Sequence, residues 1–107
     1  MPVTKRFLKS KPIVKVTFEV EKEAAKDADK IFLVGEFNEW LPIELQKFKN
    51  GKFKTALDVA TDGQTEFQYR FKLVQPDGSE VFDNDWQADA YVKNEFGTDN
   101  SVLRVYP

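Results

Sequence analysis

One stretch of the sequence organises the rest of the chain: Ile31-Phe32-Leu33-Val34-Gly35-Glu36-Phe37-Asn38-Glu39-Trp40-Leu41-Pro42. Its first four residues form a short apolar run, which predicts a buried strand. Gly35 then breaks the strand, and Asn38 and Pro42 indicate a turn or loop. Within that loop we expect the Phe37 ring to fill the core and the Trp40 ring to lie flat at the surface, where it would offer a ligand platform. The alternative is that both rings cap the core.

Length and composition fit a single domain over residues 1–107. Hydrophobic residues make up 41% of the 107 residues and aromatic residues 14%, enough for one core. Cysteine and histidine are absent, which excludes disulfides and removes the commonest metal ligand and general base. The net charge of −2 provides no overall attraction to nucleic acid or acidic membranes. The basic N-terminal residues are followed by no apolar run, so we expect no secretory signal and a cytoplasmic location.

Alternation of apolar and polar residues predicts the strands. The clearest one covers 67–74, where Phe67, Tyr69, Phe71 and Leu73 should be buried and Gln68, Arg70 and Lys72 exposed. Phe18 and Phe32 should also be buried. The other expected strands cover 14–20, 31–34, 45–49, 52–59, 80–82 and 101–106.

Turn signals separate these strands. Asn50-Gly51 predicts a hairpin in which both residues have positive φ, and Pro76-Asp77-Gly78 predicts another turn. Residues 21–30 read as a solvated connection with at most a turn of helix, and residues 83–94 as an irregular acidic stretch. About seven short strands with regular turns predict an all-β, immunoglobulin-like antiparallel β-sandwich, with under a tenth of the residues helical.

Three segments, taken in order, resemble a known family: residues 33–40, 67–71 and 96–100. They resemble the early-set, isoamylase N-terminal-like domain, which is the family-48 carbohydrate-binding module and the glycogen-binding domain of the AMP-activated protein kinase β subunit. Residues 84–89 are similar to small bacterial proteins that consist of this domain alone. The resemblance covers about residues 14–105. It implies a sandwich that binds α-1,4-linked glucans on one face, in a family whose members are often associated with family-13 glycoside hydrolases.

The resemblance also implies roles for particular residues. Trp40 would stack on a glucose ring, Arg70 would bond sugar hydroxyls beside Gln68, and the late loop would supply the remaining contacts, from Phe96, Thr98 and Asn100. The family's second platform tryptophan directly follows the Asp-Gly turn. This chain has Ser79 and Glu80 there, so that role is not transferred.

Trp86 is a second candidate platform, or it plugs the gap between the acidic stretch and the sheet. We favour the plug because Ala88, Ala90 and Tyr91 follow it closely.

Other functions use some of the same residues. A protein-interaction module of this fold would dock onto a glucan-active enzyme or another partner without binding sugar.

Three aspartates raise two further alternatives: Asp83, Asp85 and Asp89. The first is a hydrolase, which needs two carboxylates across a cleft. The second is a calcium site, although the glycine and the terminal glutamate of a calcium loop are absent. Residues 67–72 interleave aromatic and basic side chains as nucleic-acid binders do, but the aromatics are expected to be buried. We therefore expect a non-catalytic module for glycogen, starch or malto-oligosaccharides, with no metal, cofactor, nucleic acid or membrane involved.

Overall fold

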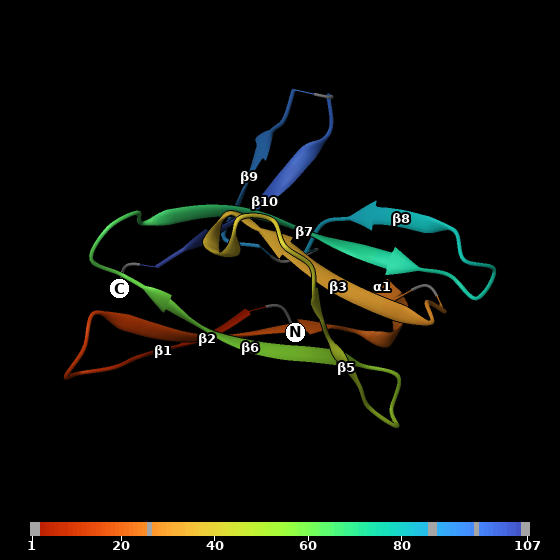
Figure 1. Ribbon diagram of the computed structural model, residues 1–107, viewed down its shortest axis with the longest axis horizontal. Helices are drawn as coiled ribbons and strands as arrows, with labels where there is room; N and C mark the ends of the chain where they lie inside the picture. The colour runs from red at the N-terminus through yellow and green to blue at the C-terminus, as the bar shows by residue number, and fades with distance from the viewer. Residues whose placement is uncertain (1–2, 26, 86–87, 96, 106–107) are drawn as a thin grey trace.

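The computed structural model shows two antiparallel β-sheets packed face to face (Figure 1). It describes residues 3–25, 27–85, 88–95 and 97–105. The first sheet has the order β1 (Val3–Phe7), β2 (Ile13–Val20), β6 (Phe53–Ala60), β5 (Gln46–Lys47). The second has the order β4 (Ile43–Glu44), β3 (Lys30–Gly35), β7 (Glu66–Val74), β10 (Asp99–Arg104), β9 (Ala90–Lys93), and β8 (Glu80–Asp83) also pairs with β7. The predicted antiparallel β-sandwich is therefore confirmed.

Helices make a small contribution to the fold. They hold 7% of the described residues and strands hold 54%, which confirms the expected low helix content. The two helices in this part of the chain are α1 (Lys22–Ala25) and the 3-10 helix η1 (Glu36–Asn38). The connection around α1 is less solvated than expected, because Ala25 and Ala28 are buried in the core. None of the helices in the described residues is long and apolar enough to span a membrane.

The number of strands differs from the sequence-based expectation. The described residues form ten strands rather than about seven. The additions are β1 in the basic N-terminal segment, the two-residue strand β4, and β9 inside the stretch that we expected to be irregular. Strand formation depends on packing against neighbouring strands more than on intrinsic preference, so pairing with β2, β3 and β10 makes these segments regular.

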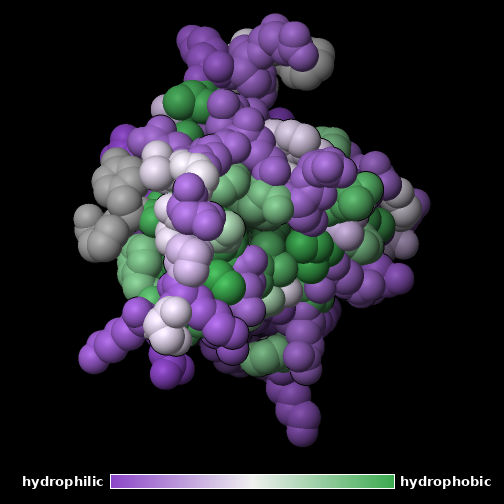
Figure 2. All heavy atoms as spheres, turned by 60° about the vertical axis from the view of Figure 1, so that its left-hand side comes forward, coloured by the Kyte–Doolittle hydropathy of each residue, from purple (hydrophilic) through white to green (hydrophobic). Residues whose placement is uncertain are grey.

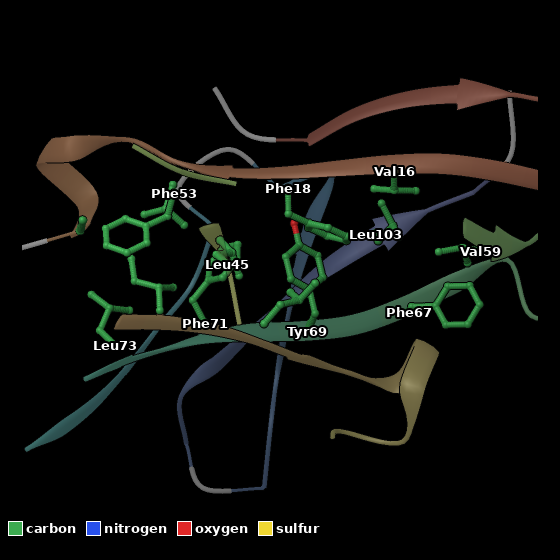
Figure 3. Packing of buried hydrophobic residues seen from close by; sticks show 14 of the residues in the cluster. Val16, Phe18, Leu45, Phe53, Val59, Phe67, Tyr69, Phe71, Leu73 and Leu103 are labelled. Carbon is green, nitrogen blue, oxygen red and sulfur yellow. The ribbon is translucent and has the colours of Figure 1, made fainter. Parts of the chain in front are cut away.

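The core lies between the two sheets and is rich in aromatic rings (Figure 3). Phe18 from β2 meets Tyr69 from β7 edge-on, with ring centroids 5.2 Å apart. Phe67, Phe71 and Leu73 are buried on the same face of β7, as predicted.

The prediction that Phe32 is largely buried is wrong, since this residue is only partly buried. Alternation along β3 places Ile31 and Leu33 in the core and turns Phe32 to the outer face of the second sheet. Gln68, Arg70 and Lys72 do lie on that outer face, but they are half-buried rather than exposed. The outer face of the second sheet is therefore partly shielded from solvent.

β7 is paired along both edges. β3 pairs with one edge over residues 69–74 of β7. The other edge is divided, since β10 pairs with residues 66–69 and β8 with residues 71–74. β10 also pairs with β9, and the β9–β10 hairpin projects from the sandwich (Figure 1). Figure 2 shows this hairpin at the top with hydrophilic residues around it, while hydrophobic residues gather lower on the same face.

Three hairpin loops of the fold share one backbone hydrogen bond: those at residues 48–52 and 75–79, and the loop that contains Gly97. In each, the glycine N–H donates to the carbonyl three residues earlier, over 3.0, 2.9 and 3.2 Å respectively. The glycines Gly51, Gly78 and Gly97 have φ of 89°, 87° and 83°. Asn50 is not among the positive-φ residues, so the loop at 48–52 is a type I turn followed by a left-handed glycine rather than the expected pair of positive-φ residues.

A buried polar network ties the chain after β8 to the sheet. The Tyr69 hydroxyl, fully buried, donates a hydrogen bond to Oδ2 of Asp85 over 2.8 Å. The Asp85 N–H donates to Oγ of Ser101 over 2.9 Å. Burial, and then the neighbouring Asp85 carboxylate, raises the pKa of the Tyr69 hydroxyl. The neutral, hydrogen-bonded tyrosine is thus the form that the fold stabilises.

Replacing Gly78 tests the hairpin geometry. A Cβ at Gly78 would meet no atom within 4 Å, so Gly78→Ala changes only the backbone preference at φ +87°. We expect it to destabilise the protein by about 1 kcal/mol in urea denaturation. Gly63 is the matched control because it also has open space but no positive φ, so Gly63→Ala should be neutral or slightly stabilising. Equal effects of the two variants would contradict the assignment.

Replacing Tyr69 tests the buried network. Tyr69→Phe leaves the Asp85 carboxylate without this donor, and we expect a loss of about 1.5–3 kcal/mol in unfolding free energy at pH 7. Because folding raises the pKa, the contribution of Tyr69 is present below the ordinary tyrosine pKa of about 10 and is lost as the pH rises above it. The variant should therefore lose less stability than the wild type above that pH. Tyr91→Phe is the comparison, since that side chain is 45% exposed and its hydroxyl donates to the backbone carbonyl of Asp85 rather than to the carboxylate. It should cost under about 1 kcal/mol.

Candidate functional site

A tight turn after β3 presents Trp40 at the surface. The Trp40 N–H donates to the carbonyl of Gly35 over 2.8 Å, which closes the turn around η1. The Asn38 side-chain amide donates to the carbonyl of Leu41 over 2.7 Å and fixes the exit of the turn. The Trp40 side chain is 42% exposed. The expected exposure of Trp40 at the surface is therefore confirmed.

The backbone of this turn is strained at two neighbouring residues. Glu39 and Trp40 both have left-handed conformations, with φ of 60° and 62°. A bulky residue rarely adopts this conformation, and each such residue costs on the order of 1–3 kcal/mol. Strain of this kind concentrates at functional sites, where the surrounding structure holds it. The turn thus holds the Trp40 backbone in a defined, unfavourable conformation at the surface.

Phe37 anchors the turn from below. Its ring packs against the core, with centroids 5.6 Å from Phe18 and 6.1 Å from Phe67. The ring also lies directly over Gly35, where an added Cβ would come within 2.5 Å of it. Glycine is therefore required at this position by close approach. This explains why the strand ends in glycine.

Trp40 borders a groove of about 690 Å³ on the outer face of the second sheet. Strands β3, β7, β8 and β10, the turn after η1 and the β9–β10 hairpin all contribute to it. The lining residues are Val34, Trp40, Gln68, Arg70, Phe82, Lys93, Asn94, Glu95 and Asn100. Two rings, several amides, two cations and one carboxylate thus face a single open space.

One side of the groove is a line of hydrogen-bonded amides. Nδ2 of Asn100 donates to Oε1 of Gln68 over 2.9 Å. Nδ2 of Asn94 donates to Oδ1 of Asn100 over 3.1 Å and to Oγ1 of Thr98 over 2.8 Å. This arrangement fixes polar groups at the groove before any ligand arrives.

Arg70 and Phe82 form another part of the groove. The guanidinium carbon of Arg70 lies 5.6 Å from the centre of the Phe82 ring, within range of a cation–π contact. Nε of Arg70 is buried and has no hydrogen-bond partner among the described residues. Phe82 is 50% exposed, so its ring remains accessible.

The structure brings together four of the seven predicted site residues: Trp40, Gln68, Arg70 and Asn100. Thr98 is not part of the lining, although its backbone N–H and hydroxyl both bond Asn94. Trp86 and Phe96 lie outside the described residues. The choice between a plug and a platform for Trp86 therefore stays a prediction.

Phe82 is the main residue that our sequence interpretation missed. It lies opposite Lys72 across the β7–β8 hairpin, on the same face as Arg70. The sequence contained a signal for this position. The loop at 75–79 sets the register of the hairpin, and alternation along the strand that begins at Glu80 then places Phe82 on the outer face of the sheet. No comparable signal identifies Lys93, Asn94 and Glu95, which reach the groove only because the β9–β10 hairpin stands where it does.

The three aspartates considered for catalysis or calcium have separate partners. Asp83 accepts from the N–H of Asn84, Asp85 accepts from Tyr69, and Asp89 accepts from the Arg104 N–H and pairs with the Lys5 ammonium. Among the described residues, no group of three or more acidic, histidine or cysteine side chains is arranged to hold a metal ion. Asp89 instead links β10 to β1 of the opposite sheet.

Replacing Gly35 tests the coupling between core and groove. Gly35→Ala must displace the Phe37 ring, and this ring is held by the core rather than free to move. We expect a loss of about 1–3 kcal/mol in unfolding free energy, as for other overpacked cores, with a change in tryptophan fluorescence. The double variant Gly35→Ala with Phe37→Leu should recover part of the loss because the smaller side chain leaves room. Full tolerance of Gly35→Ala alone would rule out this close approach.

The comparisons with known proteins leave the geometry of the groove as the main evidence on function. No model of a known protein family matches the chain, and no curated protein is significantly similar to it.

Proposed function

We propose that this protein is a non-catalytic carbohydrate-binding module for α-1,4-linked glucans such as glycogen, starch or malto-oligosaccharides. The observation that carries the proposal is the exposed Trp40 ring beside a fixed row of amides and a guanidinium in one groove. The resemblance of three sequence segments to the family-48 carbohydrate-binding module supports the same ligand class. In that reading Trp40 stacks on a glucose ring, and Gln68, Arg70 and Asn100 bond its hydroxyls.

The chemistry of sugars matches this groove. A glucose ring has apolar C–H faces and a rim of hydroxyls, so it needs a flat ring to stack on and polar groups beside that ring. Trp40 and Phe82 supply the rings, and the guanidinium of Arg70 supplies hydrogen-bond donors beside them. By analogy with base stacking, each ring is worth about 1–3 kcal/mol. Two rings with partly exposed hydrogen bonds would give a Kd roughly in the micromolar to millimolar range.

The groove supports binding rather than catalysis. Glu95 is the one carboxylate residue among its described lining, and glycoside hydrolysis ordinarily uses two carboxylates across the scissile bond. The proposal therefore gives the protein no reaction of its own and no cofactor. It includes a cytoplasmic location, which is compatible with the absence of cysteine. A glucan-active enzyme is a further candidate partner.

The exposed apolar side chains also support a second candidate, a protein-interaction module. Leu41 is 62% exposed next to Trp40, and Phe82 is 50% exposed across the groove. An apolar segment of a partner protein would also bury these side chains. The two functions differ in their response to free sugar, so a direct titration separates them.

The test is a titration with maltoheptaose, followed by tryptophan fluorescence and by NMR chemical shifts. We expect wild-type protein to bind, Trp40→Ala to lose measurable binding, and Phe82→Ala to bind about tenfold more weakly. Both side chains are substantially exposed, so neither change should lower the melting temperature much.

Phe7→Ala is the matched control, because Phe7 is 37% exposed but belongs to the other sheet. Its affinity for maltoheptaose should equal that of the wild type. No response of the wild-type protein up to millimolar sugar would reject glucan binding and favour the interaction module.

A further inference from the structure

The row of amides along the groove has a direction that the backbone sets. Oδ1 of Asn94 accepts a hydrogen bond from the backbone N–H of Thr98 over 3.2 Å. A backbone N–H can only donate, so this bond determines which end of the Asn94 amide is the oxygen. Its Nδ2 is then left to donate to Oδ1 of Asn100.

The direction of the Asn94 amide also sets the directions of the amides of Asn100 and Gln68. Because Asn100 accepts through Oδ1, its Nδ2 is the end that donates to Oε1 of Gln68. Gln68 therefore accepts at its oxygen and keeps the two N–H groups of Nε2 for the groove that it lines. Asn100 is only 8% exposed, so water competes little for these bonds.

We propose that Asn94 is a positioning residue that makes Gln68 a hydrogen-bond donor toward the bound ligand. With Arg70 and Lys93, which have only donors to offer, Gln68 then forms a donor wall in the groove. Such a wall selects ligand oxygens that act as acceptors at this point, as sugar hydroxyl and ring oxygens can. The identity of the ligand rests on the proposed function, but the direction of the amide row does not.

Asn94→Asp reverses this row with little change of shape. The aspartate keeps an oxygen for the Thr98 N–H, and the Thr98 hydroxyl can donate to the second oxygen instead of accepting. The second oxygen would also face Oδ1 of Asn100, so we expect the Asn100 amide to turn over. Gln68 would then turn over too, and its oxygen would face the groove.

The first readout needs no ligand. In wild-type protein we expect the Asn100 side-chain amide to exchange slowly with deuterium and the Gln68 side-chain amide to exchange fast. In Asn94→Asp the Gln68 amide becomes slow, because it now donates to Asn100. A slow Gln68 amide in the wild type, or no change in the variant, would overturn the proposal even if the protein binds no sugar.

The second readout is affinity for maltoheptaose. We expect Asn94→Asp to weaken binding about tenfold, the equivalent of one or two hydrogen bonds. Asn84→Asp is the matched control, since the Asn84 amide is likewise hydrogen-bonded at both ends, donating to the Asp99 carbonyl and accepting from the Ser101 hydroxyl, but does not line the groove. Its affinity should stay within about twofold of the wild type.

A double variant distinguishes positioning from general damage. Gln68→Met removes the donor that Asn94 is proposed to orient, so adding Asn94→Asp to it should weaken binding little further. Additive losses of affinity would overturn the proposal, because Asn94 would then act independently of Gln68. If wild-type protein binds no maltoheptaose, the proposed function fails, and deuterium exchange of the Gln68 amide alone decides the inference.

Discussion

Alternation of side chains along β7 is the constraint on which both the core and the groove depend. Successive residues of a strand face opposite sides of the sheet, so Tyr69 enters the core while Gln68 and Arg70 enter the groove. A slip of one residue in pairing would exchange the two faces and place charged groups between the sheets. Pairing with β3 on one edge, and with β8 and β10 on the other, prevents that slip. Stability and the proposed function therefore depend on one register.

The turn after β3 links these two faces of the molecule. Phe37 is held by core rings, and Trp40 is exposed only three residues later. Packing of the Phe37 ring over Gly35 and against the core anchors the chain just before the two left-handed residues. The site therefore carries strain that an isolated loop of the same sequence would release. This is a physical reason for the platform to be ordered before a ligand binds.

The projecting β9–β10 hairpin supplies the polar side of the groove. β10 is long enough to pair with β9 through Asp99–Val102 and with β7 through Ser101–Arg104, so it carries the hairpin away from the sandwich. Beneath this hairpin, the bond from Tyr69 to Asp85 holds the preceding chain against the sheet. The amides of Asn94 and Asn100 then connect the hairpin to Gln68. These bonds fix the polar side of the groove to the sheet.

Much of this protein was determined by local sequence. Alternation identified the long strands and the buried face of β7, and the Gly35-to-Pro42 segment correctly separated the inward Phe37 from the outward Trp40. These features depend on periods of two and on single glycine or proline positions, which one sequence is enough to read. The outward position of Phe82 was also readable, from the length of the preceding hairpin loop.

Only the tertiary structure decided the rest. β1 and β9 have weak strand signals and form because a neighbouring strand offers its open edge. Phe32 is half-buried because neighbouring strands set which face of β3 meets the core. Gln68 and Asn94 are 26 positions apart in the chain, and no local pattern predicts that a third amide, from Asn100, joins them. Contacts between distant segments depend on how the whole sandwich closes, and local sequence does not contain that information.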